Sequence, residues 1–86
     1  MPCICQFYGI SIYLYYQDHV PPHIHAVFAE HKASFAILTG QRITGDFPPR
    51  AERLVREWLD LRRAEVLASW ELSHGGTQPI RVAPLD

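Results

Sequence analysis

A chain of 86 residues with 48% hydrophobic and 20% charged residues can build one core but not two, and this balance argues against disorder. No apolar run approaches the ~20 residues that a membrane helix needs, and the first residues lack the basic and apolar segments of a secretion signal. We therefore expect a single cytoplasmic domain with no membrane partner. The formal net charge of −1 gives no overall positive field for nucleic acid, so any such binding would require a local patch.

The first half of the chain has the composition of β-strands. Residues 4–16 are rich in β-branched and aromatic side chains, and Gly9 divides them into strands near 4–7 and 10–16. In the second of these strands one face would carry Ile10, Ile12, Leu14 and Tyr16, and the other Ser11, Tyr13 and Tyr15. Cys3 and Cys5, also two residues apart, would share a face as reduced thiols.

Three more strands are expected before the pattern changes, near residues 25–28, 32–38 and 41–45. Turns at 29–31 and 39–40 separate them, and such short connections are typical of an antiparallel meander. The loop at 17–22 precedes them, because Pro21-Pro22 supplies no backbone donors and keeps Val20 extended.

A helix is predicted from about residue 48 to 74. Pro49 suits its first turn, Asp46 could cap it, and Gly75-Gly76 marks its end. Apolar residues recur along it at helical spacing: Ala51, Leu54, Val55, Trp58, Leu59, Leu61, Val66, Leu67, Trp70 and Leu72. Arg62-Arg63 is a possible kink, and residues 77–86 form a short extended tail in which Ile80–Val82 could add a strand.

These elements define an α+β fold class. Only a sheet has enough area to bury the apolar face of the helix. The expected architecture is an antiparallel sheet of four to five strands (residues 4–46), followed by one long C-terminal helix, either straight or kinked, packed on one face.

The candidate site is the segment 18–25, which reads Asp18-His19-Val20-Pro21-Pro22-His23-Ile24-His25. It holds three of the five histidines within seven residues. His23 and His25 are two apart, so on an extended backbone both rings would project from one face. The two prolines stiffen the approach to them.

Three interpretations of this segment stay open from the residues alone. In the first, His23 and His25, with His19 as a further candidate, perform acid–base catalysis without a cofactor, and Lys32 stabilises developing charge. Cleavage of RNA by its own 2′-hydroxyl suits such a pair. In the second, His23 and His25, with His19 or Asp18 as the third ligand, bind zinc or a similar ion. In the third, the histidines only hydrogen-bond to the backbone.

Tyr13 and Tyr15 form a second candidate binding feature. They could stack on the bases of RNA. They could equally form an exposed surface for a partner protein or for a second copy of the chain in a homodimer. The arginines from 50 to 63 alternate with carboxylates, which is typical of a solvated helix face.

The sequence resembles one bacterial family, catalogued as domain of unknown function 4160. The resemblance is carried by Phe7-Tyr8-Gly9-Ile10, by the Asp18–His25 string with Ala26, by Thr39-Gly40, by Gly45-Asp46, and by Trp58 and Trp70. Asp18, His19, His23 and His25 match its most specific motif, whereas Cys3 and Cys5 depart from the usual pattern.

The resemblance implies a particular cellular setting. Members are small bacterial proteins encoded beside a second small protein, an arrangement similar to a toxin–antitoxin pair. The expected function is therefore that of a toxin-like protein that acts on RNA, alone or at the ribosome, through its histidines. The expected partner is the small protein encoded nearby. A non-enzymatic protein-binding module and a small metal-binding domain are the alternatives.

Overall fold

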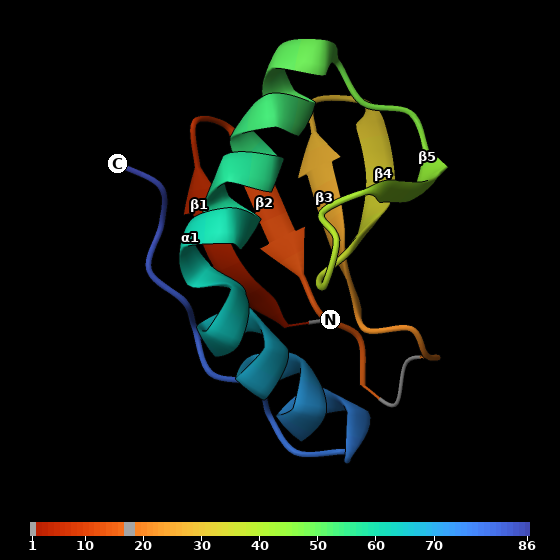
Figure 1. Ribbon diagram of the computed structural model, residues 1–86, viewed down its shortest axis with the longest axis vertical. Helices are drawn as coiled ribbons and strands as arrows, with labels where there is room; N and C mark the ends of the chain where they lie inside the picture. Colours follow the sequence, from red (N-terminus) through yellow and green to blue (C-terminus); the bar gives the residue numbers. More distant parts are fainter. Residues whose placement is uncertain (1, 17–18) are drawn as a thin grey trace.

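A computed structural model describes residues 2–16 and 19–86 (Figure 1). Its elements are, in chain order, β1 (Cys3–Phe7), β2 (Ile10–Tyr13), β3 (His23–Phe28), β4 (His31–Ala36), β5 (Arg42–Gly45) and α1 (Pro49–His74). The strands form one sheet in the order β1-β2-β3-β4-β5, and all neighbours are antiparallel. Helix α1 covers one face of this sheet (Figure 1). The predicted α+β meander is confirmed, with five strands.

The core lies between this face and α1. Alternation along the strands buries Ile10, Ile12 and Ile24, and α1 contributes Val55 and Trp58, all at most 1% exposed. Full burial of such a side chain contributes about 1.5–3 kcal/mol. Because side chains alternate along a strand, the residues between the buried ones point away from α1 and make up the second face of the sheet.

Strand bounds differ from the prediction at the end of β2 and at the start of β3, and residues 17–18 of the predicted loop lie outside the described residues. Strand β2 ends at Tyr13 rather than Tyr16, and Tyr16 is exposed instead of sharing the buried face. Strand β3 begins at His23 rather than His25. The Pro22 carbonyl accepts a hydrogen bond from the Ile37 amide at 3.0 Å, so the pairing of β3 with β4 continues up to the prolines. Both histidines of the pair therefore belong to the strand.

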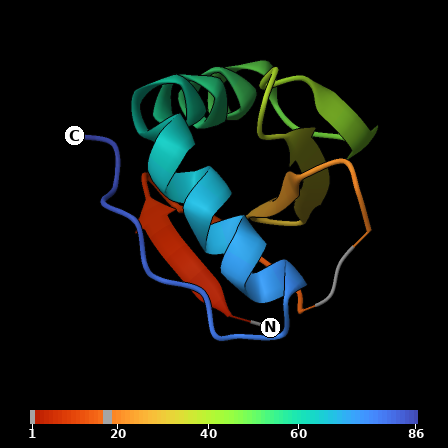
Figure 2. The same cartoon turned by 60° about the horizontal axis from the view of Figure 1, so that its bottom comes forward.

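Helix α1 is bent at Arg62, which has non-helical torsions (φ −117°, ψ 18°). Figure 2 shows the two arms of the helix on either side of this bend. The kink that the sequence left open at Arg62-Arg63 is therefore present. Leu61, expected on the apolar face, is 60% exposed because it lies outside the buried stripe of Val55, Trp58 and Leu59. The predicted Asp46 cap is wrong, because Pro48 is the N-cap and no side chain caps the helix.

The tail beyond α1 runs beside β1 (Figure 2) and contains no strand, so the predicted strand at Ile80–Val82 is wrong. One ladder-like bond forms, from the Val82 amide to the Ile4 carbonyl at 2.9 Å. Side chains supply the other attachments: the Trp58 indole donates to the Ala83 carbonyl at 2.8 Å and the Ser69 hydroxyl to the Ile80 carbonyl at 2.7 Å. The tail is thus held to both the helix and the sheet.

Cys3 and Cys5 lie on different faces of the sheet, so the prediction that they share a face is wrong. A bulge between them sets Cys3 opposite Tyr13 and Cys5 opposite Ile12, which lie on different faces of the sheet. Both thiols are free. Burial raises the pKa of the Cys5 thiol, which makes its reactive thiolate form scarcer. Within residues 2–16 and 19–86, no helix has the length and apolar character needed to cross a membrane.

Candidate functional site

The candidate site lies on the sheet face opposite α1. Along β3, Ile24 and Ala26 are buried under the helix, so His23 and His25 point to the other side, where they are half-buried. The ladders set His25 opposite Tyr13 on β2 and opposite Ser34 on β4. The predicted common face of the two histidines is therefore present, and it belongs to a regular strand.

Three rings are in contact on this face. The His23 and His25 rings meet edge to face, with centroids 4.9 Å apart and an interplanar angle of 68°. The Tyr15 ring stacks on His25 at 4.0 Å and 21°. Tyr15 lies beyond the end of β2, and the Ser73 hydroxyl at the end of α1 donates to its carbonyl at 2.9 Å. The last turn of the helix thus holds the segment that places this ring.

A backbone hydrogen bond fixes one imidazole. The Nδ1–H of His23 donates to the Pro21 carbonyl oxygen at 2.7 Å. A carbonyl can only accept, so in the neutral ring the proton is on Nδ1 and Nε2 is the basic nitrogen. The rigid proline loop therefore selects the tautomer as well as the position of the ring. The Val20–Pro21 peptide bond of this loop is cis.

Beside these rings is a shallow hollow of about 160 Å³ that spans β3, β4 and β5. It is lined by Tyr15, His25, Ala26, Val27, Lys32, Ala33, Ser34 and Thr44. The Ser34 and Thr44 hydroxyls are hydrogen-bonded to each other at 2.6 Å. Lys32 is exposed and forms no ion pair with any part of the chain that the structure describes. The lining includes the Lys32 cation and the Ser34 and Thr44 hydroxyls but no carboxylate, which is the chemistry of an anion site.

We call Tyr13, Tyr15, His23, His25, Lys32, Ser34 and Thr44 the histidine surface. It unites five of the residues singled out from the sequence. His19 is exposed, precedes β3 and does not line the hollow, and Asp18 lies outside the described residues. Within the described ranges, no three histidine, cysteine, aspartate or glutamate side chains are placed to hold a metal ion. The zinc interpretation therefore gains no support from this part of the chain.

Sequence reasoning missed Ser34 and Thr44. Ser34 follows Lys32 by two residues on β4, so strand alternation could have placed both on one face. Thr44 had no comparable signal. Its position opposite Ser34 depends on the register of β5, which shifts at an irregularity between Ser34 and Phe35. Such a shift cannot be read from hydrophobic alternation.

Fold and site together define a small α+β protein with one helix-covered sheet face and one open face that carries paired histidines. The model of the family "Domain of unknown function (DUF4160)" matches residues 9–71, nearly three quarters of the chain. The chain belongs to this family. No match was found among curated proteins or among solved structures.

Proposed function

We propose that this chain is a toxin-like bacterial protein that binds RNA at the histidine surface and cleaves it. One observation carries the proposal: an imidazole pair in ring contact lies beside a hollow that is lined by a lysine and by hydroxyl groups and that contains no carboxylate. A pair of imidazoles can supply one proton acceptor and one proton donor, and the hollow has the groups that bind a phosphate. Both are needed to cleave a phosphodiester without a metal.

The cleavage step assigns a separate role to each histidine. The 2′-oxygen of the RNA forms a bond to the adjacent phosphorus while the bond from phosphorus to the 5′-oxygen breaks. The products are a 2′,3′-cyclic phosphate and a 5′-hydroxyl. His23, whose Nε2 is the basic nitrogen, accepts the proton of the 2′-hydroxyl. His25 donates a proton to the leaving oxygen, and the Tyr15 face stacked on it attracts the charged imidazolium.

Charge stabilisation and binding come from the neighbouring strands. Lys32 can donate hydrogen bonds to the phosphate oxygens as negative charge develops, and so can one hydroxyl of the Ser34–Thr44 pair, since the other donates within the pair. Tyr13, half-buried opposite His25 in the β2–β3 ladder, offers a ring on which a base can stack. Because the chain has a net charge of −1, these local contacts must provide most of its affinity for RNA. If a ribosome presents the RNA, the chain itself needs less affinity for it.

The first test is growth of a bacterial culture after induction of the chain. We expect the wild type to arrest growth, and His23→Ala and His25→Ala to abolish arrest, because each removes one proton-transfer group. His31→Ala is the matched control, since His31 pairs with Phe28 and so lies on the helix-covered face of the sheet, not on the histidine surface. Circular dichroism spectra must show that all variants fold.

Equal growth with the wild type and the variants would contradict the toxin-like function. The alternative is then a protein-binding module that uses the same open sheet face. In that case, the small protein expected to be encoded nearby should raise the unfolding temperature of this chain on mixing. If the toxin-like function holds, the same partner should suppress arrest by covering the histidine surface.

A further inference from the structure

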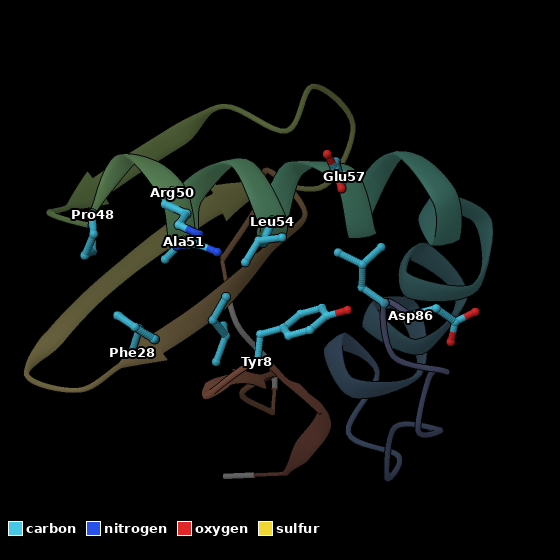
Figure 3. A pocket seen from close by; sticks show the side chains of 10 residues that line it. Tyr8, Phe28, Pro48, Arg50, Ala51, Leu54, Glu57 and Asp86 are labelled. Atoms are coloured by element: carbon cyan, nitrogen blue, oxygen red, sulfur yellow. The ribbon is translucent and has the colours of Figure 1, made fainter.

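A second concave site lies on the other face of the sheet, with a volume of about 630 Å³. It is formed where the first turns of α1 pass over the ends of β2 and β3 and the end of the tail approaches them. Figure 3 shows Arg50 and Leu54 reaching down from α1, and Tyr8 and Phe28 on the side of the sheet. It shares no lining residue with the hollow of the histidine surface.

The interior of this pocket is apolar. Ile10 and Ala51 are almost fully buried around it, and Phe28, Leu54 and Leu85 are partly buried against the core. The volume lies within the usual range of about 300–1,000 Å³ for small-molecule sites. Water in such a pocket contacts apolar walls, so an apolar group that replaces it gains binding energy.

The charged groups are divided between the two ends of the pocket. Arg50 is at one end, while Glu57 and Asp86 are at the other (Figure 3). Arg50 makes no ion pair within residues 2–16 and 19–86, so its guanidinium retains its capacity to grip a carboxylate through two parallel hydrogen bonds. The two carboxylates oppose additional negative charge at the far end.

We infer that this pocket binds a small amphipathic monocarboxylate, with the apolar body against Ile10, Phe28 and Leu54 and the carboxylate on Arg50. The division of charge excludes polyanions such as nucleotides, for which the histidine surface is the better site. The Tyr8 hydroxyl, which points along the pocket in Figure 3, can add a hydrogen bond to a polar substituent. This inference is independent of RNA cleavage.

Titration of the ¹⁵N-labelled chain with 3-phenylpropionate, followed by NMR, tests the inference. We expect saturable shifts in Tyr8, Ile10, Ala51 and Leu54 and none in His23 or His25. The neutral analogue 3-phenylpropan-1-ol should bind about tenfold more weakly, because it cannot form the charge-assisted pair. Adenosine monophosphate should leave the signals of the pocket unchanged.

Two variants distinguish a direct contact of Arg50 with the carboxylate from the effect of losing one positive charge anywhere on α1. Arg50→Gln should weaken binding of the acid about tenfold and leave the alcohol unaffected. Arg53→Gln, three residues along the same helix and outside this pocket, should change neither. Equal affinity for acid and alcohol in the wild type would overturn the inference, as would an absence of saturable shifts. Shifts in the pocket that depend on protein concentration without ligand would also overturn it, by showing that a second copy fills the pocket.

Discussion

The contact between Tyr15 and His25 shows how distant residues build the histidine surface. His25 is fixed by its strand, whereas Tyr15 depends on the Ser73 hydroxyl from the end of α1. Lys32, Ser34 and Thr44 come from two further strands. The candidate chemistry arises because these residues from different elements meet on one open face of the sheet.

Lys32 allows a test of the anion site that does not depend on cleavage. Lys32→Gln should weaken binding of uridine 3′-monophosphate about tenfold at low salt, since it removes the cation of the hollow. Isothermal titration calorimetry measures this change, and Arg53→Gln controls for the loss of one positive charge elsewhere. Unchanged affinity in Lys32→Gln would place the phosphate outside the hollow.

At the scale of elements, strand alternation and helical spacing predicted most of the fold. The alternation of Ile10, Ile12 and Leu14 identified the buried face, and the spacing of Val55, Trp58 and Leu59 identified the face of the helix. The errors occurred where a tertiary contact decides the outcome. The bond from Ile37 to Pro22 extends β3 to His23, and the bulge after Cys3 reverses the face of Cys5.

Gly45, the last residue of β5, packs closely against the backbone of β4. This close packing leads to a prediction about stability. Gly45 has φ +83°, and an added Cβ would collide with the Lys32 carbonyl. Gly45→Ala should therefore lower the free energy of unfolding by about 2–4 kcal/mol, combining backbone strain with the collision. Urea denaturation measures the loss.

Gly40 provides the matched comparison for Gly45. Its φ is +77°, but an added Cβ would meet only side-chain atoms of Arg63 and Arg56, at 3.8 Å or more. Gly40→Ala should consequently lose only about 1–2 kcal/mol, from strain alone. Equal losses at the two glycines would show that the collision at Gly45 is relieved by movement of β5.

At the scale of the whole molecule, the tail completes the core. Val82 is buried, and the Trp58 indole has its hydrogen-bond acceptor in the tail. Removal of residues 79–86 should reduce the free energy of unfolding by about 3 kcal/mol, from the exposed apolar area and the lost hydrogen bond. Urea denaturation measures the change, and removal of Asp86 alone should have little effect. A tail-free chain of unchanged stability would contradict this role.

The candidate site was only partly predictable from the sequence. The pair His23 and His25, with Tyr15 and Lys32, could be named from their spacing and chemistry. The hollow that joins them required the register of β4 with β5, and the support of Tyr15 required a contact between residues 58 positions apart. Local patterns specify which residues share a face of one element, whereas the distances across elements depend on how the whole chain packs.

The most direct test of RNA cleavage at the histidine surface uses the purified chain and an end-labelled RNA, with and without ribosomes. We expect fragments with 2′,3′-cyclic phosphate ends, a bell-shaped dependence of the rate on pH, and loss of cleavage in His23→Ala and His25→Ala but not in His31→Ala. RNA with 2′-O-methyl groups should resist cleavage, because it lacks the attacking hydroxyl. Intact RNA under all these conditions, or cleavage that persists in both folded variants, would contradict RNA cleavage at the histidine surface.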